Sequence, residues 1–302
     1  MEDISFSERP SLRNPVLIGA FAGWNDAAGV ATAVVQFLVQ AWSAVKFATV
    51  DPEEYYVFTR VRPQVFIDEG KHRRIEWPAN DFYYHVDPDS SHDFILLSGI
   101  EPQLKWKRYT RQVLDLAQEF GVATFMTLGG FLRDVAHTQP SHLSASASDP
   151  ELLGRLKGVS AMGSRYEGPT GILGVLNTIC RDRGMPTATM WGSVSHYLSS
   201  VANPRVTRDM LKTIDGMFDL KLVLRDFNKE IAEFDSRVAD AIARNPELSA
   251  YVRQLEERDR SAEESTPEDT GGTGAGTGSE SILKELENFL KQRREENSPD
   301  GL

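Results

Sequence analysis

The chain has 302 residues, 44 of them acidic and 33 basic, which gives a net charge of −11. Hydrophobic residues make up 40% and charged residues 25%, as is usual for soluble globular proteins. No stretch approaches the ~20 consecutive apolar residues that a membrane-spanning helix needs. The start, MEDISFSERPSL, lacks the pattern of a signal peptide. We therefore expect a cytoplasmic protein without a membrane segment. The acidic balance disfavours nucleic acid as a partner.

The first half of the chain predicts strands with helices between them. Residues 16–21 form a short, β-rich apolar run, and a helical pattern begins soon after it. A stretch richer in strands follows, which we expect to form an antiparallel or mixed flap. Its predicted strands are 47–50, 55–59, 64–67, 74–77 and 82–86.

The middle of the chain continues this alternation. Residues 93–98 read as the clearest buried strand, stopped by Gly99, and a helix is predicted over 105–119. The next strand, 122–128, is expected to end at Gly129 and Gly130. A helix is then expected after Gly171, and a further strand at 187–194. The alternation predicts an α/β fold, a three-layer α/β/α sandwich with a mixed sheet.

From residue 206 onward we expect only helices, at 206–221, 228–244 and 246–258. The predicted organisation is an α/β core at 1–225, a helical extension at 226–260, a disordered linker at 261–280, and an amphipathic helix with a tail at 281–302. The core has 25 acids against 23 bases (−2), and residues 226–302 have 19 against 10 (−9). The terminal helix either docks on this chain or a neighbouring subunit, or binds a partner.

Four glycine-containing loops are expected to follow strands and to meet at one edge of the sheet. Ligands of α/β sheets bind at that edge. Carboxylates there could act as acid and base or hold Mg²⁺. In the alternative interpretation, Asp26 and Thr170 are helix N-caps and the glycines only form turns. The candidate pocket residues are Gly23, Trp24, Asn25, Asp26, Gly99, Glu101, Gly129, Gly130, Glu167, Gly168, Thr170 and Gly171.

Common catalytic signatures are missing. The sequence contains no phosphate-binding P-loop, no G-x-S-x-G elbow and no H-E-x-x-H zinc motif. His137 and His142 lie five residues apart in a loop-like segment, which is not the spacing of a helical metal-ligand pair. Cys180, the only cysteine, falls beside an apolar helix face and is expected to fill the core. We therefore expect no catalytic residue, no metal site and no cofactor.

Several segments, in this order, resemble the proteasome assembly chaperone family, and most closely its actinobacterial branch. They are GAFAGWNDAAG, LLSGIEPQLKW, TLGG, AHTQP, YEGPTGILGVL, MWGSVSHYL and ANP, and the resemblance extends over residues 15–221. It implies a core similar to nucleoside phosphorylases and peptidyl hydrolases, without the catalytic residues of those enzymes. Family members scaffold proteasome α-subunits in eukaryotes and archaea, whereas the role of bacterial members is unsettled. The bacterial relatives resemble homotrimers.

The chain departs from the family pattern at two places. Proteasome-docking members often end in a hydrophobic residue, a tyrosine and one more residue, whereas this chain ends in Ser298, Pro299, Asp300, Gly301 and Leu302. This difference argues against direct docking on the proteasome. Relatives also tend to have Pro before the histidine and Arg after the threonine of the segment 135–139, which reads VAHTQ here.

These observations lead to one expectation and one alternative. We expect a non-enzymatic assembly chaperone or scaffold that is homo-oligomeric, as a trimer, and has a protein partner related to the proteasome. The alternative is a protein or enzyme that binds a small, nucleotide-like ligand through the carboxylates at the strand ends.

Overall fold

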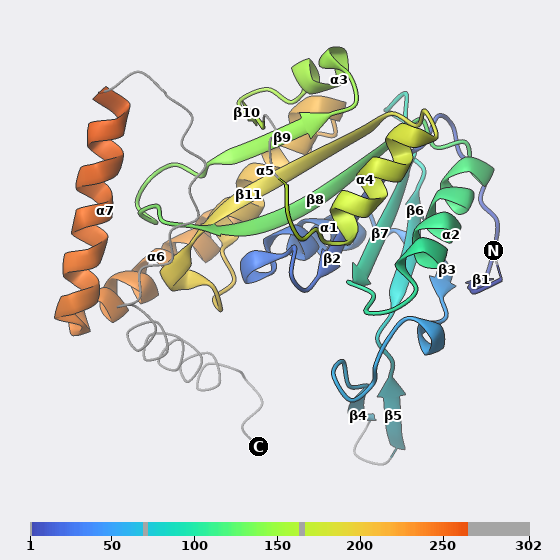
Figure 1. Ribbon diagram of the computed structural model, residues 1–302, viewed down its shortest axis with the longest axis horizontal. Coiled ribbons are helices and arrows are strands. Elements are labelled where there is room, and N and C mark those ends of the chain that lie inside the picture. The colour runs from blue at the N-terminus through green and yellow to red at the C-terminus, as the bar shows by residue number, and fades with distance from the viewer. Residues whose placement is uncertain (1, 69–71, 163–166, 265–302) are drawn as a thin grey trace.

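A computed structural model describes residues 2–68, 72–162 and 167–264 (Figure 1). The last helix, α7 (Pro246–Glu264), includes the first four residues of the predicted linker. The rest of that linker and the predicted amphipathic helix at 281–302 lie outside the described residues. No helix in the described part of the chain is long and apolar enough to cross a membrane.

The centre of the molecule is a mixed nine-stranded sheet with the order β1-β3-β6-β7-β2-β8-β11-β9-β10. Strands β7, β2, β8 and β11 run parallel to one another, and β6, β3 and β9 are antiparallel to their inner neighbours. The strands are β1 (Ile4–Phe6), β2 (Val16–Ala22), β3 (Val45–Val50), β6 (Asn80–His85), β7 (Phe94–Ile100), β8 (Thr124–Arg133), β9 (Leu143–Ala147), β10 (Ser160–Ala161) and β11 (Thr187–Ser195).

Helices cover both faces of this sheet, as the apolar runs of its central strands require. Helices α1 (Val30–Ala41) and α5 (Pro204–Phe218) pack on one face. Helices α2 (Trp106–Glu119) and α4 (Ile172–Asp182) pack on the other (Figure 1). The predicted three-layer sandwich is thereby confirmed. Helices α6 (Phe227–Arg244) and α7 enclose a third apolar cluster around Phe234 and Leu248.

Three glycines that were expected to end strands lie inside them instead. Gly99 belongs to β7, while Gly129 and Gly130 belong to β8, which continues to Arg133. Each glycine makes room for a neighbour: a side chain at Gly129 would overlap Trp191 on β11, and one at Gly99 would overlap Asn80 on β6. A side chain at Gly130 would overlap Val30 at the start of α1. The loop interpretation of these three residues was therefore wrong, because they serve close packing, Gly99 and Gly129 against neighbouring strands and Gly130 against α1.

The expected strand at 55–59 was also wrong. A 3-10 helix, η2 (Pro52–Glu54), precedes Tyr55, and the backbone N–H groups of Tyr55 and Tyr56 donate back to Pro52 O, which holds this stretch in a turn. The elements that we did not expect are short. They include β1, β9, β10 and α3 (Pro150–Arg155).

Of the predicted flap, two strands form a separate hairpin, whereas β3 and β6 belong to the main sheet. Strand β4 (Gln64–Asp68) pairs antiparallel with β5 (His72–Glu76) as an independent two-stranded sheet. The hairpin projects from the body of the molecule at the edge where the parallel strands end (Figure 1).

Candidate functional site

The loops after β2 and β7 meet at the start of α4, through Glu101. Oε1 of Glu101 accepts a hydrogen bond from Nδ2 of Asn25 at 2.8 Å and another from the backbone N–H of Ile172 at 2.8 Å. The carboxylate thus caps α4, whose own N-cap residue, Gly171, offers no side chain. Asn25 is buried, and a side chain at Gly171 would overlap its amide group.

Asp26 caps α1 from the same edge of the sheet. Its carboxylate accepts hydrogen bonds from the N–H groups of Ala31 (2.7 Å) and Thr32 (3.2 Å) and from the hydroxyl of Thr32 (2.5 Å). Asp26 is also bridged to Gly130, and the N–H of Gly130 donates to Asn25 O at 2.8 Å. Burial raises the pKa of the Asp26 carboxyl, and its three hydrogen bonds oppose this effect.

The other candidate residues do not join this cluster. Trp24, Glu167, Gly168 and Thr170 are exposed to solvent, and Thr170 does not cap α4, because its hydroxyl lies against Gly171 O at 3.4 Å. Gly23 lies against the side chain of Glu101, whereas the space beside Gly99 and Gly129 is filled by Asn80 and Trp191. The structure therefore brings together Gly23, Asn25, Asp26, Glu101, Gly130 and Gly171.

This cluster has few groups left for chemistry. Both carboxylates are engaged in capping helices. The described residues contain no group of three or more His, Cys, Asp or Glu side chains that could hold a metal ion.

Near the ends of β8 and β11 lies a space of about 20 Å³, bordered by His137, Ser193 and Arg205. That space is about the size needed for one water molecule.

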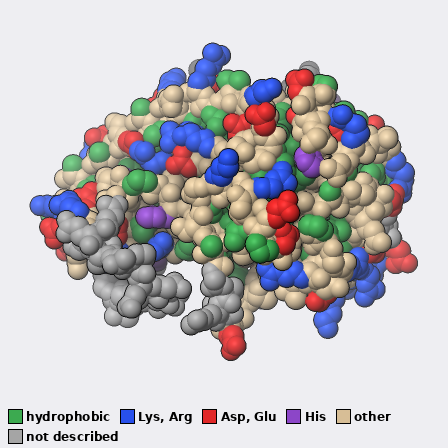
Figure 2. Space-filling model, turned by 90° about the horizontal axis from the view of Figure 1, so that it is seen from above, with side chains coloured by type: hydrophobic (Ala, Val, Ile, Leu, Met, Phe, Trp, Pro, Cys, Tyr) green, Lys and Arg blue, Asp and Glu red, His purple; other side chains and the backbone are tan. Residues whose placement is uncertain are grey.

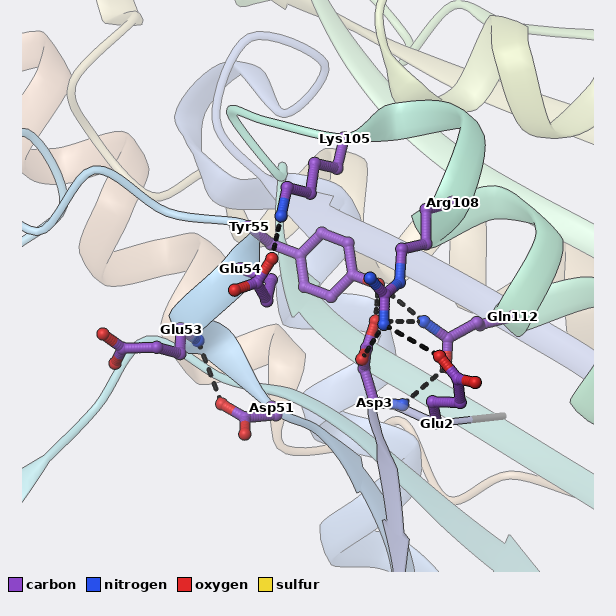
Figure 3. Close-up of polar contacts among 9 residues, drawn as sticks. All are labelled: Glu2, Asp3, Asp51, Glu53, Glu54, Tyr55, Lys105, Arg108 and Gln112. Atoms are coloured by element: carbon purple, nitrogen blue, oxygen red, sulfur yellow. Dashed lines mark hydrogen bonds and ion pairs between the residues drawn. The ribbon is translucent and has the colours of Figure 1, made fainter.

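Sequence reasoning missed a polar cluster at the β1 edge of the sheet, where β1 meets α2 (Figure 3). The carboxylate of Asp3 accepts hydrogen bonds from Tyr55, Arg108 and Gln112, each at 2.5 Å. Burial raises the pKa of Asp3, but these three donors outweigh burial and hold the pKa below its ordinary value. Arg108 and Gln112 are one turn apart on α2, but Asp3 and Tyr55 lie more than 50 residues from them in the sequence, so no local spacing indicates the cluster.

A second missed cluster fastens α7 to the loop after β8. The hydroxyl of Tyr197 accepts the backbone N–H of His137 at 2.8 Å. Asp259 accepts the N–H of Ala136 at 3.1 Å, and Glu256 accepts the hydroxyl of Thr138 at 2.7 Å. Burial raises the pKa of Tyr197 to about 12, although the hydrogen bonds with the N–H of His137 and with the side chain of Ser195 lower the pKa. This cluster ties the helical extension to the core.

Comparison with known proteins places the chain in a protein family. A family model described as the PAC2 family matches residues 20–242. A PAC2 family protein from Streptomyces avermitilis is 35% identical, with a TM-score of 0.70, over 79% of this chain and 99% of its own. A proteasome-assembly chaperone homologue from Mycobacterium tuberculosis is 33% identical, with a TM-score of 0.70, over 78% of this chain and 99% of its own.

A more distant structure, an archaeal proteasome activator from Pyrococcus furiosus, is 21% identical, with a TM-score of 0.65, over 78% of this chain and 97% of its own. That likeness concerns the fold alone. No curated protein matches the chain.

Proposed function

We propose, from the premise that this chain belongs to the PAC2 family, that it is a non-enzymatic assembly chaperone or scaffold. It acts in the cytoplasm as a homo-oligomer and binds a protein partner, for which proteasome subunits are the expected class.

The observation that carries this proposal is the use of the carboxylates at the strand ends. Glu101 and Asp26 accept five hydrogen bonds between them from groups of the protein itself. A catalytic acid or base needs a lone pair or proton that faces the substrate. Here the carboxylates hold α1 and α4 against the sheet instead, which favours a structural role for this edge.

The family relatives support the choice of partner. The homologue from Mycobacterium tuberculosis, named for proteasome assembly, shares 33% of its residues with this chain over almost its whole length. The surface does not favour nucleic acid: on the face shown in Figure 2, Lys and Arg side chains lie among Asp and Glu rather than in a continuous basic field.

Binding to purified proteasome α-type and β-type subunits, measured by biolayer interferometry with the full chain, tests the proposal. Trp24 lies at the carboxyl end of β2 with 67% of its surface exposed, and large exposed aromatic residues often dominate protein interfaces. We expect Trp24→Ala to weaken subunit binding at least tenfold. Val223→Ala is the matched control, since Val223 is 66% exposed at a different place in the fold. Failure of the wild-type chain to bind any of these subunits would overturn the proposal.

Self-association is a separate part of the proposal, and three copies are the expected number. One chain has a mass of 33.7 kDa, so light scattering on the full chain should report about three times that mass. A mass of one chain at all concentrations would contradict self-association while leaving the partner open.

A further inference from the structure

The small space near the ends of β8 and β11 lies at the start of α5, and we call it the α5 pocket. Ser141, Ser193 and Arg205 border it. Its volume of about 20 Å³ admits one particle of the size of a water molecule or a chloride ion. Pro140 and His142 also border the pocket and are exposed, so that small ions can reach it from solvent.

Three polar groups that border the α5 pocket have no hydrogen-bond partner among the described residues. The hydroxyl of Ser141 and Nε of Arg205 are both buried. Ser193 is only 5% exposed, and its backbone N–H donates to His142 O at 3.0 Å, whereas its hydroxyl makes no hydrogen bond with a described residue. Buried polar groups without a partner destabilise the fold, so an occupant that accepts from all three would stabilise it.

The start of α5 adds a further donor and a positive partial charge. Oδ1 of Asn203 accepts the N–H of Val206 at 3.2 Å, and its backbone oxygen accepts the N–H of Thr207 at 3.2 Å. Pro204 has no N–H, so the backbone N–H of Arg205 is the donor of this turn without an acceptor in the described part of the chain. No acidic side chain lies in the first turn to offset the positive end of the helix.

The charges around the α5 pocket are also arranged for an anion. Arg205 borders it, and no Asp or Glu does among the described residues. Asp235 pairs with Arg205 through Nη2 at 2.5 Å and not through Nε, and the Asp235 side chain is 42% exposed to solvent. Glu256, the other carboxylate of this region, accepts the hydroxyl of Thr138.

The ring of His137, which borders the pocket as well, is a donor too. Burial lowers the pKa of His137, so the ring is neutral at pH 7. The hydroxyl oxygen of Tyr197 accepts the backbone N–H of His137 at 2.8 Å and lies 2.7 Å from Nδ1 of its ring. The Tyr197 proton therefore goes to Nδ1, and the single N–H of the ring is at Nε2.

We propose that the α5 pocket binds one monatomic, monovalent anion of the size of chloride. The hydroxyls of Ser141 and Ser193 and Nε of Arg205 hold it. Water is the competing occupant, and the anion is favoured by the guanidinium, by the start of α5 and by the lack of a bordering carboxylate. Phosphate and other polyatomic anions exceed the volume.

The site goes beyond the proposed function, since it depends neither on a partner nor on self-association. The anion joins the loop after β8, through Ser141, to β11 and to the start of α5. The same loop is fastened to α7 through Ala136 and Thr138. Because the three segments come together only in the folded chain, anion binding raises the stability of the native state.

Thermal unfolding of the full chain in sodium chloride, compared with sodium gluconate at equal ionic strength, tests the site. We expect the Tm of the wild-type chain to be higher in chloride by about 3 °C. Ser193→Ala and Arg205→Lys should each lose most of this shift. The lysine keeps the positive charge beside Asp235 but has no Nε–H. Each variant is compared with itself in two salts, so a general loss of stability does not imitate the result.

Two matched variants serve as controls and should keep the full shift. Ser144→Ala removes a hydroxyl that is also buried and unpartnered among the described residues but does not border the pocket. Arg208→Lys changes an arginine of the same helix that pairs with Asp209 at 3.0 Å and does not border the pocket either. If the controls lose the shift as well, chloride acts elsewhere and the proposal is wrong.

Crystals of the full chain grown with sodium bromide locate the ion. We expect anomalous scattering between Ser141, Ser193 and Arg205. A water molecule in that place would overturn the proposal, as would an equal chloride shift in Ser193→Ala and the wild-type chain. An anomalous peak without any chloride-dependent shift in Tm would mean binding at crystal concentration only, which also contradicts a site that works in solution.

Discussion

Single polar residues hold this molecule together across long distances in the sequence. Glu101 joins the loop after β2 to the start of α4, and Asp26 joins the same loop to α1. Near the other end of the parallel strands, the buried Asp93 accepts hydrogen bonds from the N–H of Arg13 at 2.6 Å and from its guanidinium at 2.9 Å. Each of these carboxylates satisfies backbone donors that would otherwise be left unpaired.

Removal of the Glu101 carboxylate should destabilise the fold. Glu101→Ala leaves the N–H of Ile172 and the amide of Asn25 without their acceptor, so we expect the free energy of unfolding to fall by about 2 kcal/mol. Glu101→Gln keeps an oxygen in place and should cost about half as much. Urea unfolding measures both, with the exposed Glu167→Ala as the control, expected within about 0.5 kcal/mol of wild type. Equal losses for Ala and Gln would show that charge, not the acceptor, matters.

Asp93 should make the free energy of unfolding depend on pH. Burial raises the pKa of its carboxyl, but the hydrogen bonds from Arg13 and Asp87 outweigh burial and hold the pKa below the ordinary value of 3.8. A lowered carboxyl pKa contributes stability that is present above the unfolded pKa and is lost as the pH falls through the folded pKa.

Asp93→Asn should therefore lower the free energy of unfolding by about 2 kcal/mol at pH 7. The gap to wild type should shrink as the pH falls below about 4. Unfolding curves between pH 3 and pH 7 measure this. A gap that stays constant down to pH 3 would contradict the assigned role.

At the scale of elements, the start of α7 was predictable, whereas the end of α5 and the roles of the glycines were not. Asn245 caps α7 as its sequence position indicates, through the N–H of Leu248 at 3.0 Å. The same signal, Asp149 before Pro150, marks α3 and could have revealed it. Gly129 gave no such signal, because the neighbour that needs its space, Trp191, lies 62 residues away and meets it only across the sheet.

The packing role of Gly130 predicts a sharp contrast between two glycines. A Cβ at Gly130 would lie 2.7 Å from Cγ2 of Val30 and 3.0 Å from Ala27 O, so Gly130→Ala must push α1 away from the sheet. We expect a loss of about 2 kcal/mol in the free energy of unfolding. Gly216→Ala in α5 meets open space and should instead stabilise by about 0.5–1 kcal/mol. Thermal and urea unfolding distinguish the two, and a tolerated Gly130→Ala would show that α1 adapts freely.

At the scale of the whole molecule, alternating strands and helices sufficed to predict three layers, but not how the strands are ordered. Some strands outside the parallel centre pair with partners far away in the sequence, as β1 does with β3 and β9 does with β11. The meeting of Asn25, Asp26 and Glu101 at one edge was predictable, because parallel strands end on the same side. Whether they border an open pocket was not, since this depends on hydrogen bonds to α1 and α4 that form only in the folded chain.

The cooperatively folded part of the chain should end within α7. All residues of the three apolar clusters lie at or before Leu255, and α7 supplies Leu248, Val252 and Leu255 to the third. Deletion of 265–302 should therefore change the free energy of unfolding by less than about 0.5 kcal/mol. The number of copies in the oligomer should stay the same. Deletion from residue 246 onward removes these three side chains and should cost about 4 kcal/mol or more. Equal stability of the two truncated chains would mean that α7 does not belong to the cooperative unit.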